Sequence, residues 1–456
     1  MFSTNRVSDI DQSVNRSTSQ GNTVLRILEK NYRNNLDSDY TERIEKLDKN
    51  FKYSSNSNHY WSEPELSLLY GTPLYEAASP SQKIALNHLF WVVVYKTIAD
   101  SEVEITHYNL ITAGSLTAMG ADYETIAHQL EHETDQERSH IHAFYKVSYQ
   151  TQKALLGKQA FIDSLNKKSS KHNWGSLEFA NYQSFVLEFI PKMMLKGKEQ
   201  YNSPYLRKFS EENKPISTST NGFFNGLRVN LPQSLPQFFA FNWGSSPFLA
   251  CNYYTVRYLA NLALKNYEHK IHMYCKKLHK QNQFVPVPTT ISHYHFLDEA
   301  FHTTTSLFLA RDLHKHLPES GAYEKFVANV KVYMTQCQNL SQLSGVLPNS
   351  FIGVSSFLMV YIYKLLQSPL FGMSAVEALH WMEKCLCHEH DGFHVNLKFH
   401  QRLLSDIRNF AAQIDYLWPV NREMRLMASG ASIDRAISKN AKAFKEFSRS
   451  VSRYQA

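Results

Sequence analysis

Two short motifs in this sequence place a glutamate and a histidine on the same side of a helical turn. Glu137 and His140 form one Glu-x-x-His motif, and Glu299 and His302 form the second. Residues three positions apart are neighbours on a helix surface, so each motif presents a carboxylate and an imidazole in one direction. His295 precedes Glu299 by four positions and adds another imidazole to that face. Carboxylates and imidazoles in such clusters are typical ligands of transition metals.

Two further glutamates lie among apolar residues at helical spacing. Glu102 follows Ile98 by four positions, and Glu268 lies between Leu264 and Ile271. Both side chains should therefore point into a helical core. Two Glu-x-x-His helices, with one glutamate from each of two other helices, form the ligand set of ferritin-like di-iron carboxylate bundles. Four carboxylates balance the charge of two ferrous ions, and open metal positions remain for dioxygen.

An exposed, solvated helix face is the alternative explanation for these motifs. A single Glu-x-x-His is weak, because chance matches are common. Here the motif recurs on an otherwise apolar helix that also carries His295. Burial of four carboxylates without a cation would cost many kcal/mol, so either these faces are exposed or a metal is present. The recurrence favours the metal.

Four long helices must position these residues. Ser79 is a suitable N-cap and Pro80 a suitable first residue, which predicts a helix from there to about Met119. The other three are predicted over residues 121–153, 247–279 and 291–316, and shorter helices over 323–340, 350–366 and 374–387. Few segments alternate with a period of two. We therefore predict an all-α protein built on a ferritin-like helical bundle.

The rest of the chain is arranged around this bundle. Residues 1–24 are polar and are predicted to form a disordered tail. Residues 25–153 and 246–420 are expected to supply the two halves of the bundle and its flanking helices. The stretch 154–245 contains the turn-rich run PISTSTNGFFNG and is predicted to be an inserted subdomain or lid. Residues 421–456 are predicted to form a basic helical extension.

Composition narrows the class of protein. The 456 residues include only five cysteines, which favours reduced thiols in a cytosol-like compartment. The first residues lack the apolar stretch of a secretory signal, and the apolar run LFWVVVY is far shorter than a membrane span. We expect a cytoplasmic protein with no membrane span. The net charge of +7 could favour an acidic partner and does not by itself indicate nucleic acid.

The spacing of the metal-binding candidates resembles that of the p-aminobenzoate N-oxygenase family of di-iron enzymes. Glu102 precedes Glu137 by 35 positions, and Glu268 precedes His295 by 27. The run YEAASPSQK before the first long helix is also similar to that family, as is Trp91, eleven residues before Glu102. The similarity covers residues about 70–150 and 245–316. It implies the metal ligands Glu102, Glu137, His140, Glu268, His295, Glu299 and His302.

The chain departs from that family in two respects. The family usually has Asp before each Glu of Glu-x-x-His, where it accepts a hydrogen bond from a ligating imidazole. Asp298 keeps this residue, but position 136 is Gln. The chain is also longer, and in length and layout it is more similar to the cyanobacterial cylindrocyclophane-type halogenases.

The resemblance implies an O2-dependent dinuclear enzyme of natural-product biosynthesis. The first hypothesis is chlorination of an unactivated aliphatic C–H bond of a fatty acyl chain carried by an acyl carrier protein. The alternatives are N-oxygenation of an amine or C–H hydroxylation, and a non-catalytic iron-handling protein. The implied cofactors are two iron ions, or a mixed Mn/Fe pair, with O2 and, for a halogenase, chloride. An electron donor such as a reductase or ferredoxin and a homodimer complete the expected partners.

Two other features fit an acyl substrate. A row of basic residues near the C-terminus could dock an acidic carrier protein, although a solvated basic helix is the simpler interpretation. Aromatic residues of the insertion could wall an acyl tunnel, although plain core packing is the more common explanation for aromatic residues at such spacing. The basic residues are Arg435, Lys439, Lys442, Lys445, Arg449 and Arg453, and the aromatic residues are Phe223, Phe224, Phe238, Phe239, Phe241 and Trp243.

Overall fold

The computed structural model describes most of the chain. The described residues are 23–157, 189–191, 193–195, 205, 234–341, 343–350, 354, 356–428 and 432–455. Every regular element among them is a helix, which confirms the predicted all-α class. The predicted disordered tail, except its last two residues, and most of the predicted insertion lie outside the described residues.

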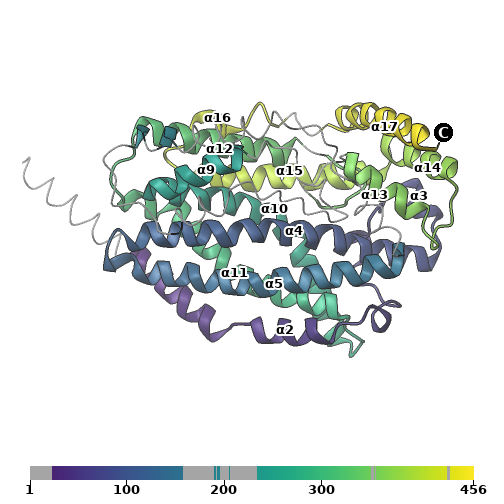
Figure 1. Cartoon of the computed structure of the whole chain (residues 1–456), viewed down its shortest axis with the longest axis horizontal. Helices are drawn as coiled ribbons and strands as arrows, with labels where there is room; N and C mark the ends of the chain where they lie inside the picture. The colour runs from purple at the N-terminus through teal and green to yellow at the C-terminus, as the bar shows by residue number, and fades with distance from the viewer. Residues whose placement is uncertain are drawn as a thin grey trace, which may run out of the picture.

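Within the described part, four long helices form the centre of the molecule (Figure 1). They are α4 (Pro80–Thr117), α5 (Glu124–Leu156), α10 (Pro247–Lys280) and α11 (Val287–Arg311). α4 packs along α5, and α10 packs along α11. The helix at residues 23–37 and α2 (Thr41–Asn50) precede them, and α2 packs against α5 and α11.

The start of α4 shows how the local sequence determines where a bundle helix begins. The Ser79 hydroxyl accepts a hydrogen bond from the Gln82 N–H, and the Gln82 side chain accepts one from the Ser79 N–H. This capping box satisfies two backbone donors, and Pro80 occupies the first helical position, where no donor is needed. All ten residues from Leu86 to Tyr95 are buried, so this half of α4 is enclosed by other helices.

The predicted boundaries hold for α4 and α10 and shift for α11. α11 begins at Val287, directly after Pro286, and ends at Arg311, while the predicted continuation to residue 316 is a 3-10 turn at Leu313–His316. The sequence patterns also missed α15 (Asp391–Ala411). Its buried face includes Asn396 and His400, and these polar residues interrupt the apolar stripe that would have indicated a helix.

A second layer of helices covers α10 and lies along the upper side of the bundle in Figure 1. It contains α12 (Ala322–Leu340), α13 (Ser356–Leu366), α14 (Ala375–Cys387), α15, α16 (Pro419–Glu423) and α17 (Ile433–Gln455). α9 (Ser234–Ser245), the described end of the predicted insertion, packs on α10 and α4. Phe239 and Trp243 of α9 are buried in the core there. None of the described helices has the length and apolarity that crossing a membrane requires.

Candidate metal centre

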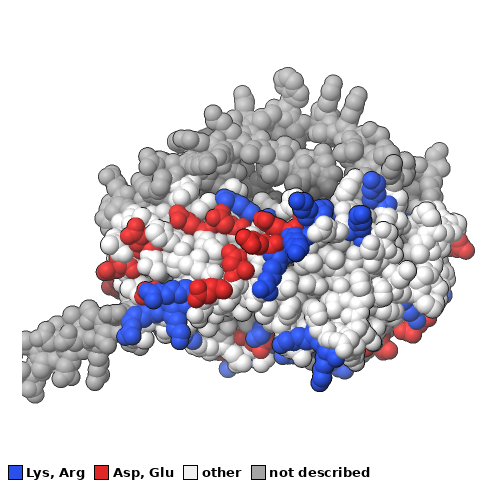
Figure 2. Space-filling view, turned by 90° about the horizontal axis from the view of Figure 1, so that it is seen from below, with Lys and Arg blue, Asp and Glu red and all other residues white. Residues whose placement is uncertain are grey.

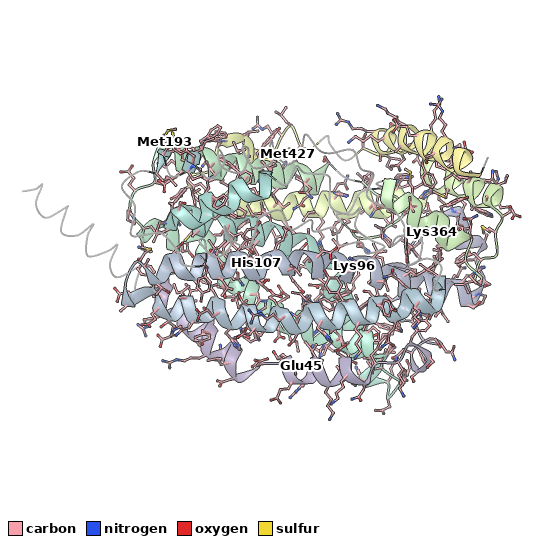
Figure 3. All side chains as sticks on the ribbon, viewed as in Figure 1. Glu45, Lys96, His107, Met193, Lys364 and Met427 are labelled. Carbon is pink, nitrogen blue, oxygen red and sulfur yellow. The ribbon has the colours of Figure 1, made fainter. Side chains whose placement is uncertain are left out.

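The structure brings all seven candidate ligands together in the interior of the four-helix bundle. α4, on which Figure 3 labels Lys96 and His107, contributes Glu102, and α5 contributes Glu137 and His140. The remaining residues are Glu268 on α10 and His295, Glu299 and His302 on α11. Six of the seven are buried, and the Glu299 side chain keeps 14% of its surface exposed. The predicted inward orientation of these helix faces is therefore confirmed.

A continuous series of short contacts joins the carboxylates and imidazoles. Nε2 of His295 lies 3.0 Å from Oε1 of Glu102, and Nδ1 of His295 lies 3.0 Å from Oε1 of Glu268. Nδ1 of His302 lies 2.8 Å from Oε1 of Glu299. Four carboxylates within such a small volume repel one another unless cations lie between them.

These ligand atoms form two overlapping groups, which we call position A and position B. Position A contains Glu102, His140, His295 and Glu299, and position B contains Glu137, Glu299 and His302. Glu299 belongs to both groups, as a carboxylate that bridges two metal ions would. Glu268 adjoins position A through its contact with His295.

The donor set fits a pair of metal ions. Oε2 of Glu102 is buried and makes no hydrogen bond to any described residue. The close pair formed by Glu268 Oε1 and His295 Nδ1 also lacks hydrogen-bond geometry. Buried charged atoms are costly without a partner, and a cation between them would remove that cost.

The two histidines of the Glu-x-x-His motifs each have a hydrogen-bond partner at Nε2, the ring nitrogen that faces away from the candidate centre. Nε2 of His140 lies 3.1 Å from Oδ2 of Asp298, and Nε2 of His302 lies 3.0 Å from Oε1 of Gln136. Asp298 and Gln136 each directly precede the glutamate of the opposite motif. Both imidazoles therefore turn Nδ1 toward the carboxylates. The amide oxygen of Gln136 occupies the place of the expected aspartate.

Sequence reasoning missed a buried ion pair beside the centre. Arg257 on α10 is 3% exposed, and its guanidinium lies 2.9 Å from Glu133 Oε2 and 3.0 Å from Glu137 Oε1. Helical spacing could have revealed both residues. Glu133 is four positions before Glu137, and Arg257 is eleven positions, about three turns, before Glu268.

The electrostatics of the metal-free centre show how its charges balance. Burial, together with the charge of Glu137, raises the pKa of Glu102 to about 7. Burial opposes protonation of His140, yet hydrogen bonds to Asp298 and Glu137 raise its pKa to about 9. Burial likewise opposes protonation of His302, but nearby carboxylates, Glu299 first, hold its pKa well above the usual value. Protonated imidazoles thus supply the positive charge that bound metal ions would supply.

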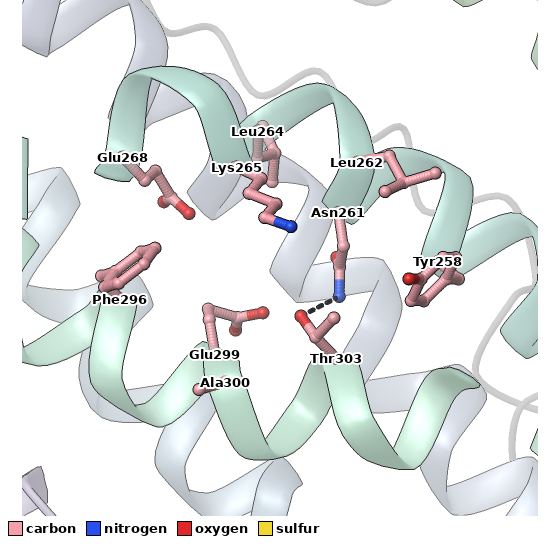
Figure 4. Close-up of a pocket in the computed structure, with 10 residues that line it drawn as sticks. All are labelled: Tyr258, Asn261, Leu262, Leu264, Lys265, Glu268, Phe296, Glu299, Ala300 and Thr303. Carbon is pink, nitrogen blue, oxygen red and sulfur yellow. Dashed lines mark hydrogen bonds between the residues drawn. The ribbon is translucent and has the colours of Figure 1, made fainter. Parts of the chain in front are cut away.

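A pocket reaches the centre between α10 and α11 (Figure 4). It has a volume of about 260 Å³, and Glu268 and Glu299 form part of its wall. Apolar groups of Leu262, Leu264 and Phe296 make up much of the lining. The side chain of Asn261 donates a hydrogen bond to Thr303 across it. The pocket therefore opens directly onto two of the candidate ligands.

Charge on the outer surface is distributed unevenly. Figure 2 shows Lys and Arg interspersed with Asp and Glu on the face seen from below the bundle. On α17, by contrast, basic residues share the exposed side while Phe444 and Phe447 face the core. α17 packs on α13 and α14. The exposed basic residues are Arg435, Lys439, Lys442, Lys445 and Arg449, and the side chain of Arg453 lies outside the described residues.

Comparison with known proteins finds a match to a family model. No curated protein and no solved structure matches the chain. A family model described as acyl halogenase CylC-like matches residues 23–448 and so includes every residue of the candidate centre. The chain therefore belongs to the CylC-like acyl halogenase family.

Proposed function

We propose that this chain is a dinuclear metal enzyme that chlorinates an unactivated aliphatic C–H bond of a fatty acyl chain. The single observation that carries the proposal is the convergence of Glu102, Glu137, His140, Glu268, His295, Glu299 and His302 from four helices. Family membership supports an acyl chain as substrate and halogenation as the reaction. Two iron ions, or an iron and a manganese ion, are the cofactors that such a carboxylate-rich set suits.

The chain's own residues would bind the metals and the substrate in distinct ways. Four glutamates and three histidines would hold the ions, which with dioxygen supply the oxidising power that no side chain has. Asp298 and Gln136 would fix the imidazole orientation. The apolar lining of the pocket would hold an aliphatic chain and exclude water, so that one carbon lies beside Glu268 and Glu299.

The reaction exchanges one hydrogen of the substrate for chlorine. Dioxygen is the oxidant, chloride is the halogen source, and the hydrogen leaves as a proton. The reduction of dioxygen to water requires more electrons than this substitution releases, so an external donor such as a reductase or ferredoxin must supply the remainder. Delivery of the acyl group by an acidic carrier protein would use the exposed basic residues of α17, for example Lys442 and Lys445.

Hydroxylation of the same carbon, or oxygenation of an amine nitrogen, is the second candidate. It is favoured by one observation, which is that none of the four carboxylates of the ligand set is missing. Mononuclear iron halogenases make room for chloride by the loss of a carboxylate ligand, and this centre shows no such loss. The two reactions must therefore be distinguished by identifying the product.

The test begins with metal content and ends with product mass. The full chain is loaded with ferrous iron under anaerobic conditions, and metal per chain is measured by inductively coupled plasma mass spectrometry. About two irons are expected. The loaded protein then receives a fatty acyl carrier protein, a reductant and dioxygen, with or without chloride.

Mass spectrometry of the acyl chain separates the reactions. A chloride-dependent product with the isotope pattern of chlorine supports chlorination, whereas incorporation of oxygen from labelled dioxygen supports hydroxylation. The Glu299→Ala variant is the control and should give neither product. Zero or one iron in the folded wild-type protein would contradict the dinuclear proposal as a whole.

A further inference from the structure

Positions A and B offer a metal ion different sets of donors. Position A has the imidazoles of His140 and His295 and the carboxylate of Glu102, with Glu268 adjoining. Position B has a single imidazole, that of His302. Glu299 belongs to both groups, and its Oε1 lies 2.8 Å from Nδ1 of His302 and 3.8 Å from Nε2 of His295. Position A is therefore the richer site in nitrogen donors, while each group contains two carboxylates.

The hydrogen-bond partners of the imidazoles increase this difference in metal affinity between positions A and B. His140, in position A, is hydrogen-bonded to the carboxylate of Asp298 at 3.1 Å. His302, in position B, is hydrogen-bonded to the neutral amide oxygen of Gln136 at 3.0 Å. A carboxylate acceptor raises the basicity of a ligating imidazole more than an amide does, because it carries a full negative charge. The two imidazoles thus differ in strength as well as in number.

A reciprocal pair of hydrogen bonds fixes the orientation of Gln136. Asn35 donates from Nδ2 to Oε1 of Gln136, and Gln136 donates from Nε2 to Oδ1 of Asn35, each at 3.0 Å. Both residues are buried, and Asn35 comes from the helix at residues 23–37. The pairing leaves Oε1 facing His302, so the amide supports the imidazole in one orientation only.

A cation also draws negative charge away from position B. Nη2 of Arg257 lies 3.0 Å from Oε1 of Glu137, the same oxygen that lies 3.3 Å from Nδ1 of His302. Arginine stays protonated, so a metal ion at position B must share this carboxylate with a fixed positive charge. Among the described residues no such cation contacts Glu102, the corresponding glutamate of position A.

We propose that Gln136 and Arg257 make the two metal positions unequal, so that position A fills first and position B binds its ion more weakly. This inference rests on the proposed dinuclear function and adds an order of loading to it. The weaker position B is then the one at which the ion exchanges most readily. Gln136 and Arg257 act as positioning residues, because each reaches the metal only through a ligand.

The test measures metal binding to the metal-free full chain and not activity. Cobalt(II) is added in steps under anaerobic conditions, and its visible absorption together with equilibrium dialysis gives the two dissociation constants. The wild-type protein is expected to bind two ions with constants that differ by about tenfold or more, the size of effect that outer hydrogen-bond partners have on metal affinity.

Two nearly isosteric variants exchange a carboxylate and an amide in the side chains that hydrogen-bond to His140 and His302. Gln136→Glu should strengthen the second binding step by about tenfold, and Asp298→Asn should weaken the first step by a similar factor. The double variant keeps the net charge and should reverse or abolish the difference between the steps. Gln401→Glu, an exposed position on α15, is the matched control and should change neither constant.

Each outcome separates this inference from the function on which it rests. Binding of fewer than two ions by the wild-type protein would overturn the dinuclear function itself. Binding of two ions with equal constants, or equal changes of both steps in each single variant, would overturn only the inequality. Circular dichroism checks the folding of each variant. Gln136→Glu loses the hydrogen bond that Gln136 donates to Asn35. If this loss prevents folding, the two dissociation constants of Asp298→Asn decide whether the positions are unequal.

Discussion

Arg257 and Glu137 form a fully buried ion pair that joins α10 to α5 beside the candidate metal centre, with 3.0 Å between Nη2 and Oε1. The same guanidinium contacts Glu133 at 2.9 Å, so one cation lies between two carboxylates. Burial alone would raise the pKa of Glu137, but His302, His140 and Arg257 together hold it well below its usual value. The carboxylate is thus kept ionised by its protein neighbours alone.

Removal of Arg257 should destabilise the metal-free protein more than the metal-loaded one. Arg257→Leu leaves Glu133 and Glu137 buried without their cation, which costs about 3–5 kcal/mol. A metal ion at position B would compensate Glu137 and recover part of that loss. Urea denaturation with and without cobalt(II) measures both values, and Glu133→Gln, which keeps the Arg257–Glu137 pair, is the control. An equal loss in both forms would contradict the link between Arg257 and the metal.

The membership of Glu299 in both position A and position B predicts a difference between two ligand variants. Glu299 belongs to both metal positions, whereas His302 belongs only to position B. Glu299→Ala should therefore lose most metal from both positions, and His302→Ala should retain about one ion per chain, given one metal for each complete ligand group. Metal analysis of the purified proteins gives the stoichiometry. Full occupancy in either variant would show that these residues are not ligands.

Closure of the pocket should stop turnover and leave the metal in place. Ala300 lines the pocket and is exposed on α11, so Ala300→Phe would fill space needed by an acyl chain. We expect chlorination to fall by about 100-fold, because a small misplacement of the reacting carbon has that effect. Ala300→Ser is the matched control. An unchanged rate in Ala300→Phe would place the substrate route elsewhere.

Helical spacing was sufficient to predict that the seven candidate ligands face the interior, because each lies on the inward face of a long, continuous helix. The N-cap Ser79 and the following Pro80 were enough to predict where α4 begins, because both act locally. The hydrogen bond between Gln136 and Asn35 could not be predicted, because 101 positions separate the two residues and only the fold brings them together. For the same reason the sequence showed only that position 136 lacks the usual aspartate, and not that the Gln136 amide oxygen accepts the expected hydrogen bond from His302.

Carrier recognition can be tested on the basic side of α17. Reversal of Lys439, Lys442 and Lys445 to glutamate should slow association with an acidic carrier protein on the order of tenfold or more at low salt, because it removes electrostatic steering. Binding rates by surface plasmon resonance at two salt concentrations measure this. The control reverses three exposed lysines of another surface: Lys46, Lys49 and Lys52. Equal effects of the two triple variants would reflect net charge alone.

His88 gives a pH dependence of stability that is independent of the metal centre. Its ring stacks on Trp61 at 4.0 Å, Nδ1 lies 3.1 Å from the Tyr53 hydroxyl, and Nε2 lies 2.7 Å from the carbonyl oxygen of His59. Burial lowers the pKa of His88 from 6.5 to about 4. Between these values the unfolded chain binds a proton that the folded protein excludes. The free energy of unfolding should therefore fall as pH decreases from 6.5 to 4.

The size of this effect follows from the shift in pKa. Two and a half pKa units correspond to about 3 kcal/mol, lost progressively across that pH range. His88→Gln keeps a donor for the His59 carbonyl and an acceptor for the Tyr53 hydroxyl but cannot bind the proton. Urea denaturation of both proteins at pH 6.5, 5.5 and 4.5 isolates His88, because all other titrating groups are common to the two. The variant should lose less stability on acidification, and parallel curves would show that His88 is not buried as a neutral imidazole.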